Sequence, residues 1–98
     1  MQFETSRVIR ADHGSLAGHF PGVPIVPGVV ILDEVLAAVE QWRGARVRII
    51  RAVKFLQPLL PEQQFTIVAD AFSKNEIAFR CLANDRIIVE GRLETGAE

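Results

Sequence analysis

The sequence has a single cysteine, no clear excess of either charge and no long uninterrupted hydrophobic run. Because Cys81 is the only cysteine among 98 residues, an intrachain disulfide is excluded. The net charge of −1 argues against a general nucleic-acid binder. Residues 23–32 form an apolar run that is too short for a membrane span and is broken by prolines and a glycine. Residues 1–10 mix charged and apolar side chains and do not predict a signal peptide. A cytoplasmic protein is therefore expected.

Metal ligands and nucleotide loops are equally scarce. The two histidines, His13 and His19, have no partners at ligand spacing, so no metal site is predicted. No glycine-rich loop of the dinucleotide-binding type follows a strand. The apolar neighbours of Cys81 indicate a buried thiol rather than a nucleophile. The sequence therefore predicts neither a metal nor a dinucleotide cofactor.

Length and hydrophobicity predict one small domain over residues 1–98. Apolar residues make up 49% of the chain, as in globular proteins. A domain of this size exposes much of its surface and is often marginally stable alone, so a second copy of the chain is the simplest partner.

Hydrophobic periodicity predicts an α+β fold with one helix. Apolar residues recur at three- and four-residue spacing over 29–43, and Gly44 supplies a stop signal. Because residues 29–32 are apolar on every side, we expect the amino-terminal half of the helix to be buried all round. Alternating or β-branched segments predict strands over 3–11, 46–56, 65–72, 76–82 and 86–93. The order β-α-β-β-β-β, with short turns between the last four strands, predicts an antiparallel sheet with the helix on one face.

The segment 18–33 holds the residues best suited to catalysis. Prolines at 21, 24 and 27 stiffen a loop that leads to Gly28 at the start of the helix. The first helical amides lack intrahelical partners and can hold an oxyanion. His19 can accept a proton near neutral pH, and an Asp33 buried in the helix could keep a proton and act as an acid. These parts suit proton abstraction beside a carbonyl followed by elimination.

A structural interpretation of the same residues stays open. A lone loop histidine is usually structural, and Asp33 and Glu34 flank the apolar stripe of the helix at similar angles. Periodicity cannot choose between these two carboxylates, and both could belong to the polar side of the helix.

The string 19–33 closely resembles the signature of the 3-hydroxyacyl-acyl-carrier-protein dehydratases of bacterial fatty-acid synthesis. The matching residues are His19, Phe20, Gly22, Pro24, Pro27, Gly28 and, fourteen positions after the histidine, Asp33. Residues 54–61 resemble the family's second strand and its proline-containing turn more weakly. The resemblance implies a hot-dog fold, in which a curved antiparallel sheet wraps one long helix.

Carried over, the resemblance assigns a role to each motif residue. His19 would take the C2 proton of a 3-hydroxyacyl thioester, and Asp33 would protonate the departing C3 hydroxyl. Amides of Gly28 and Val29 would hold the thioester oxygen. Two further motif residues, Phe20 and Pro27, would contact substrate. The product would be the trans-2-enoyl thioester.

The resemblance also implies the partners of such a domain. The active unit would be a homodimer, because the histidine and the carboxylate come from different subunits. The substrate would arrive on the phosphopantetheine of a carrier protein or on CoA, and no other cofactor, nucleic acid or membrane would be involved.

Two departures from the family pattern bear on activity. Ala37 occupies the position where the family usually has a glutamine, four residues beyond the carboxylate. The chain is also much shorter than the usual enzymes, which leaves little material for lids or tunnel walls and leaves the acyl chain length open.

Three functional hypotheses follow. The leading one is a dehydratase; the alternatives are a hot-dog acyl thioesterase and a non-catalytic acyl-binding domain. Five basic residues fall within positions 43–54. This cluster is either a solvated strand edge or a docking patch for an acidic carrier, for which Arg46, Arg48 and Lys54 are expected to share one side of a strand.

Overall fold

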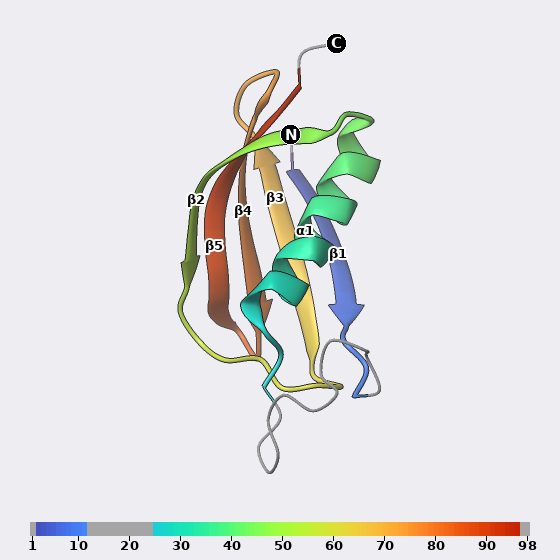
Figure 1. Cartoon of the computed structure of the whole chain (residues 1–98), viewed down its shortest axis with the longest axis vertical. Coiled ribbons are helices and arrows are strands. Elements are labelled where there is room, and N and C mark those ends of the chain that lie inside the picture. Colours follow the sequence, from blue (N-terminus) through green and yellow to red (C-terminus); the bar gives the residue numbers. More distant parts are fainter. Residues whose placement is uncertain (1, 12–24, 97–98) are drawn as a thin grey trace.

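A computed structural model of the chain describes residues 2–11 and 25–96. Five strands and one helix follow one another in the predicted order (Figure 1). The elements are β1 (Gln2–Val8), α1 (Gly28–Arg43), β2 (Val47–Phe55), β3 (Gln64–Ala71), β4 (Glu76–Ala83) and β5 (Arg86–Thr95). The predicted order β-α-β-β-β-β is confirmed. Its first strand is shorter than expected and ends at Val8 rather than near Ala11.

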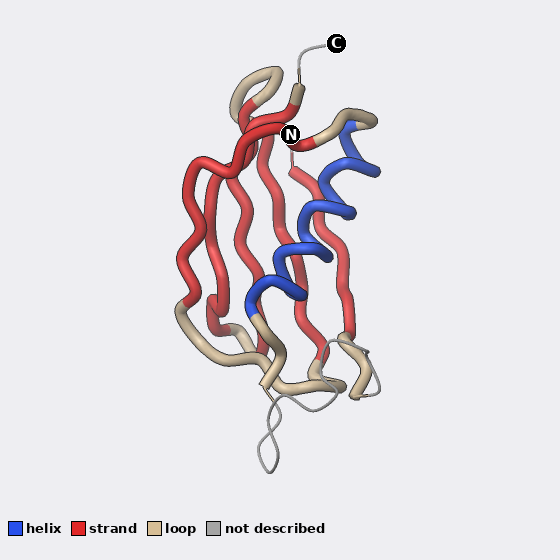
Figure 2. Tube along the Cα trace, in the orientation of Figure 1, coloured by secondary structure: helices blue, strands red, loops and turns tan. Residues whose placement is uncertain are grey.

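The strands form one antiparallel sheet in the order β1-β3-β4-β5-β2. Short turns join β3 to β4 and β4 to β5, so these strands lie side by side. The β4–β5 turn contains Asn84 and Asp85, both with positive φ (52° and 62°), which is the backbone of a tight two-residue hairpin. The chain enters β1 at one edge of the sheet, and β2 closes the other edge by pairing with β5. Figure 2 shows the helix crossing one face of this sheet.

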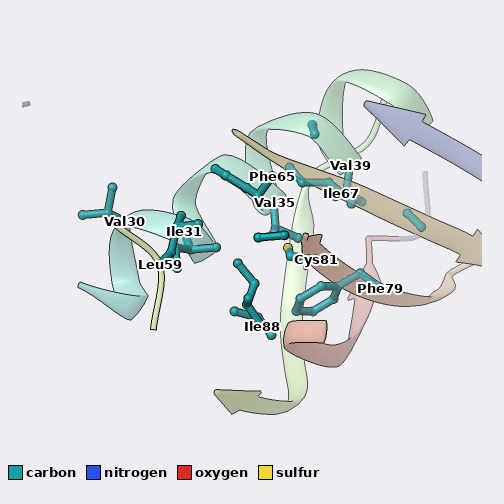
Figure 3. Packing of buried hydrophobic residues seen from close by; sticks show 14 of the residues in the cluster. Val30, Ile31, Val35, Val39, Leu59, Phe65, Ile67, Phe79, Cys81 and Ile88 are labelled. Atoms are coloured by element: carbon teal, nitrogen blue, oxygen red, sulfur yellow. The ribbon is translucent and has the colours of Figure 1, made fainter. Parts of the chain in front are cut away.

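The core lies between α1 and the sheet face that it covers. Alternate residues of β3 and β4 point into it, as the strict burial alternation of Glu76–Ala83 shows. Val35 and Val39 of the helix are fully buried against residues such as Ile67 and Cys81 (Figure 3). This single layer pair is the arrangement of the hot-dog fold. The assignment of residues 1–98 to one domain stays a prediction.

The helix ends where the sequence indicates. Gly44 has φ 64°, a conformation that favours glycine, and its N–H donates to the Glu40 carbonyl oxygen at 2.9 Å. The Glu40 carboxylate then accepts the Val47 N–H at 2.8 Å. Helix and second strand are thus joined through one residue.

Candidate active site

The predicted catalytic base cannot be placed. His19 and Phe20 lie outside the described residues, as do Gly22 and Pro24 of the motif. The roles expected of His19 and Phe20 therefore stay predictions. The other site residues expected from the sequence lie on α1 and around β2.

The amino-terminal end of α1 is built without an acidic or capping side chain. Pro27 takes the N-cap position with φ −59° and ψ 141°, and its carbonyl oxygen accepts the Val30 N–H at 3.0 Å. No acidic residue occurs in the first turn, and no side chain caps it among the residues that the structure describes. By helix geometry the Gly28 and Val29 amides have no intrahelical acceptor, so they can donate to an oxyanion.

Gly28 is also required by packing. A Cβ atom at this position would lie 2.6 Å from Cε1 of Phe55, so any side chain would displace that ring. Phe55, at the end of β2, is half exposed and lies beside the first helical turn. The absence of a side chain at Gly28 lets the ring and a ligand approach the same backbone amide.

A groove of about 490 Å³ opens at this helix end. Its lining is mainly apolar and comes from the first turn of α1 and the segment that follows β2: Val26, Gly28, Val29, Ile31, Phe55, Leu56, Gln57, Pro58 and Leu59. The sequence analysis did not assign Phe55 and Leu56 to the site. The available signal was two large apolar residues in succession at the end of a strand, just before Pro58.

Asp33 is exposed, contrary to the expectation of a helix start buried all round. Val29, Asp33 and Ala37, spaced four residues apart, form an exposed stripe, and Val29 is 63% exposed. The expectation was wrong because only the other side of the first turn, with Val30 and Ile31, is buried in the apolar core. Asp33 therefore shares a solvent-facing side of α1 with the exposed Val29 of the groove.

Asp33 and Glu34 differ in their contacts. Glu34 forms an ion pair with Arg7 of β1, with 3.3 Å between Oε1 and Nε. Within the described part of the chain, no hydrogen bond or ion pair engages the Asp33 carboxylate. The structure thus gives Glu34 a role in attaching the helix to β1 and leaves Asp33 available to a ligand. Sequence periodicity could not make this distinction.

The basic residues near β2 are exposed but do not follow a simple alternation. Arg46 precedes the strand, while Arg48 and Lys54 lie within it. The pairing of β2 with β5 shifts register between Val47 and Ile49 and again between Ile50 and Ala52. Because each irregularity interrupts the alternation of side chains, spacing alone does not establish the shared side of Arg46, Arg48 and Lys54, which stays a prediction.

Cys81 is buried in the core. Desolvation by the surrounding apolar side chains raises the pKa of its thiol to about 12, so the thiolate is inaccessible near neutral pH. The expectation of an inert buried thiol is confirmed. Across residues 2–11 and 25–96 no group of three potential metal ligands occurs, and no helix there is long and apolar enough to span a membrane.

Comparisons with known proteins place the chain in a family of proteins described as dehydratases. The family model described as ApeI dehydratase matches residues 1–92. Proteins from Chlamydia trachomatis serovars L2 and D, named 3-hydroxyacyl-[acyl-carrier-protein] dehydratase FabZ, are 33% identical in an alignment 92 positions long, and the alignment covers 79% of this chain. The chain spans about three fifths (60%) of the length of these curated relatives.

Solved structures share the fold. The dehydratase heterocomplex ApeI:P from Xenorhabdus doucetiae aligns with a TM-score of 0.84 at 23% identity, covering 98% of this chain and 88% of that one. An uncharacterized protein from Erwinia carotovora gives 0.78 at 27% identity, with coverages of 97% and 82%. The fluoroacetyl-CoA thioesterase FlK gives 0.72 at 13% identity, with coverages of 98% and 84%. Since dehydratases and a thioesterase share this fold, the fold alone does not choose the reaction.

Proposed function

Since this chain belongs to the ApeI-like dehydratase family, we propose that it removes water from a 3-hydroxyacyl thioester to give the trans-2-enoyl thioester. The substrate is carried on the phosphopantetheine of a carrier protein or on CoA, in fatty-acid or related acyl-chain synthesis. The observation that carries the proposal is Asp33, which is exposed and unpaired on the same side of α1 as Val29 at the groove.

The proposed steps balance without an oxidant or reductant. His19 takes the C2 proton, and the electron pair of the C–H bond moves toward the thioester carbonyl. The negative charge that develops on the carbonyl oxygen is held by the Gly28 and Val29 amides, at the positive end of the helix dipole. Asp33 gives its proton to the C3 hydroxyl, the C–O bond breaks and water leaves as the double bond forms. No cofactor beyond the pantetheine arm is needed by this proposal.

The groove beside Gly28 is the proposed site for the thioester end of the substrate. Its wall of Phe55, Leu56 and Pro58 is apolar, which suits an acyl or pantetheine chain. The Phe55 ring covers Gly28 closely enough to limit water at the amide that faces the developing charge. Water exclusion strengthens such a hydrogen bond because the local dielectric is lower.

We propose that the active unit is a homodimer. The exposed stripe on α1 includes apolar Val29 and Ala37 beside Asp33, and β2 presents exposed apolar residues at a free sheet edge. A second subunit over these surfaces would enclose Asp33, which this chain alone leaves exposed. A cytoplasmic location belongs to the same proposal.

The decisive experiment incubates the purified protein with a panel of 3-hydroxyacyl thioesters and follows loss of water by mass spectrometry. Asp33→Asn and His19→Ala are expected to lower kcat by at least about 100-fold, because each removes a proton-transfer group. Glu34→Gln is the matched control: it changes the neighbouring carboxylate, which is bound to Arg7, and kcat should stay within about twofold.

Two other outcomes would replace the proposal. Release of free thiol without enoyl product would indicate a thioesterase. An intact assembly that binds acyl thioesters but turns none over, with or without His19→Ala, would indicate an acyl-binding domain.

A further inference from the structure

Among the described residues that line the groove beside Gly28, only Gln57 has a polar side chain. The other lining residues are glycine, proline or residues with apolar side chains. Gln57 is exposed, and within residues 2–11 and 25–96 its carboxamide makes no hydrogen bond. A carbonyl oxygen and an NH2 group are therefore available to a ligand in an otherwise apolar groove.

The backbone around Gln57 is held in place. The Leu56 and Gln57 N–H groups both donate to the Ile88 carbonyl oxygen, at 2.8 and 3.3 Å. Pro58 follows, and a proline ring restricts the preceding residue to extended conformations. Leu59, the next residue, is fully buried. These contacts fix the direction in which the Gln57 side chain leaves the backbone.

The rest of the connection between β2 and β3 is bonded to the segments beside it. The Leu59 carbonyl oxygen accepts the Val26 N–H at 2.9 Å. Further along, the Glu62 N–H donates to the Ile9 carbonyl oxygen at 2.7 Å, and the Glu62 carboxylate accepts the Ala11 N–H at 2.6 Å. This wall of the groove is therefore preformed, as is usual for small-molecule sites.

An unpaired carboxamide suits one part of the proposed substrate better than the other. Pantetheine carries amide groups, the nearer of which is separated from the sulfur by an ethylene group, whereas an alkyl acyl chain has no polar group beyond its 3-hydroxyl. The Gln57 carboxamide can accept from an amide N–H or donate to an amide carbonyl oxygen. An alkyl chain in the same place would remove water from the carboxamide without replacing its hydrogen bonds, which is unfavourable.

We propose that Gln57 binds the pantetheine amide nearest the thioester sulfur, an inference that rests on the proposed function. With the thioester carbonyl at the Gly28 amide, the pantetheine arm runs along the wall that contains Gln57, and the acyl chain leaves the groove in another direction. One hydrogen bond joins the Gln57 carboxamide to the pantetheine amide. Because this bond is remote from the reacting carbon atoms, it stabilises the bound substrate and the transition state equally and acts on KM rather than kcat.

Two thioesters of 3-hydroxybutyrate test this role. The N-acetylcysteamine thioester keeps the amide, and the S-pentyl thioester has the same chain length without it. Gln57→Met keeps the length of the side chain and removes its polar groups, so it should raise KM for the first thioester about fivefold and leave KM for the second and both kcat values unchanged. Gln41→Met is the matched control, because Gln41 is exposed on α1 and does not line the groove; it should change neither KM.

Binding of S-butyryl-pantetheine gives a readout that does not depend on dehydration, because this ligand lacks the 3-hydroxyl and cannot lose water. Its Kd should rise about fivefold in Gln57→Met, and the NMR signal of the Gln57 side-chain NH2 should shift as the ligand is added to the wild type. A wild type that binds this ligand through Gln57 but dehydrates no thioester would overturn the proposed function and leave amide recognition standing. An active wild type whose Gln57→Met variant keeps its KM, or raises KM equally for both thioesters, would overturn the role of Gln57 alone.

Discussion

The two edge strands of the sheet, β1 and β2, differ in their side-chain contacts and in their exposed apolar surface. On β1 exposed and half-buried residues alternate, Phe3 stacks on Trp42 with ring centroids 5.2 Å apart, and Arg7 pairs with Glu34. On β2 the register shifts twice, and large apolar side chains such as Ile50 and Phe55 are 44% and 52% exposed. Figure 1 shows β1 and β2 at opposite edges of the sheet, and α1 contacts both strands.

This difference indicates which edge of the sheet is suited to contact a partner. At the β1 edge, side chains of the strand contact the helix through ring stacking and an ion pair. The edge at β2 combines free strand hydrogen-bonding groups with exposed apolar surface, which in a soluble protein marks an interaction site. The same strand ends at Phe55 in the groove, so the proposed dimer contact and the proposed catalysis would involve one strand.

The largest effect is expected from Gly91→Ala, which breaks the attachment of β2. A Cβ at Gly91 would overlap the Ala52 carbonyl oxygen of β2 and lie 2.8 Å from the Phe79 ring. Since a backbone oxygen cannot move without moving the strand, we expect a loss of about 3 kcal/mol in the free energy of unfolding. Urea denaturation followed by circular dichroism measures it.

Gly44→Ala is the matched control for this prediction. Its φ of 64° strains an alanine, but no atom lies within 4 Å of the added Cβ. The expected loss is about 1 kcal/mol from backbone conformation alone. If both variants lose the same free energy of unfolding, the contact between Gly91 and the Ala52 carbonyl oxygen is not the reason that position 91 requires glycine.

Residues with local signals were predicted well from the sequence, and residues whose surroundings come from elsewhere in the chain were not. The helix end followed from Gly44 because the left-handed cap is a property of one residue. The exposure of Asp33 did not follow, because periodicity shows an apolar side but not which part of it the sheet leaves uncovered. The contacts of Glu62 with Ile9 and Ala11 join positions some fifty residues apart, and no pattern in the chain indicates them.

A pair of lysine substitutions tests the comparison of the two edges directly. Ile50 on β2 and Val8 on β1 are β-branched and similarly exposed, at 44% and 46%. We expect Ile50→Lys to raise the Kd of the proposed dimer at least about 100-fold, because a charge would be buried in an apolar interface. Val8→Lys should leave the Kd unchanged. Sedimentation equilibrium measures both.

The activity of the same variants links the edge to the site. With a site that needs both subunits, Ile50→Lys should lose turnover at protein concentrations where it is monomeric and regain it at higher concentrations. A monomeric Ile50→Lys variant with full turnover would separate assembly from catalysis.

The smallest effect concerns the charged residues beside β2. Arg46 and Arg48 are exposed at its start, while Lys54 is exposed near its end. As proposed docking residues for an acidic carrier, they act through long-range attraction that salt screens, so each is worth little alone. We expect Arg46→Glu or Arg48→Glu to raise KM for a carrier-bound substrate about fivefold and to leave KM for a small thioester unchanged. The effect should shrink as salt concentration increases.

Arg86→Glu is the control that separates an effect of net charge from docking at β2. It makes the same change in net charge at the exposed start of β5, away from the entry to β2. If the carrier is attracted only by the net charge of the protein, Arg86→Glu will raise KM as much as Arg48→Glu does. If the carrier docks on the β2 edge, Arg46→Glu and Arg48→Glu will raise KM and Arg86→Glu will not.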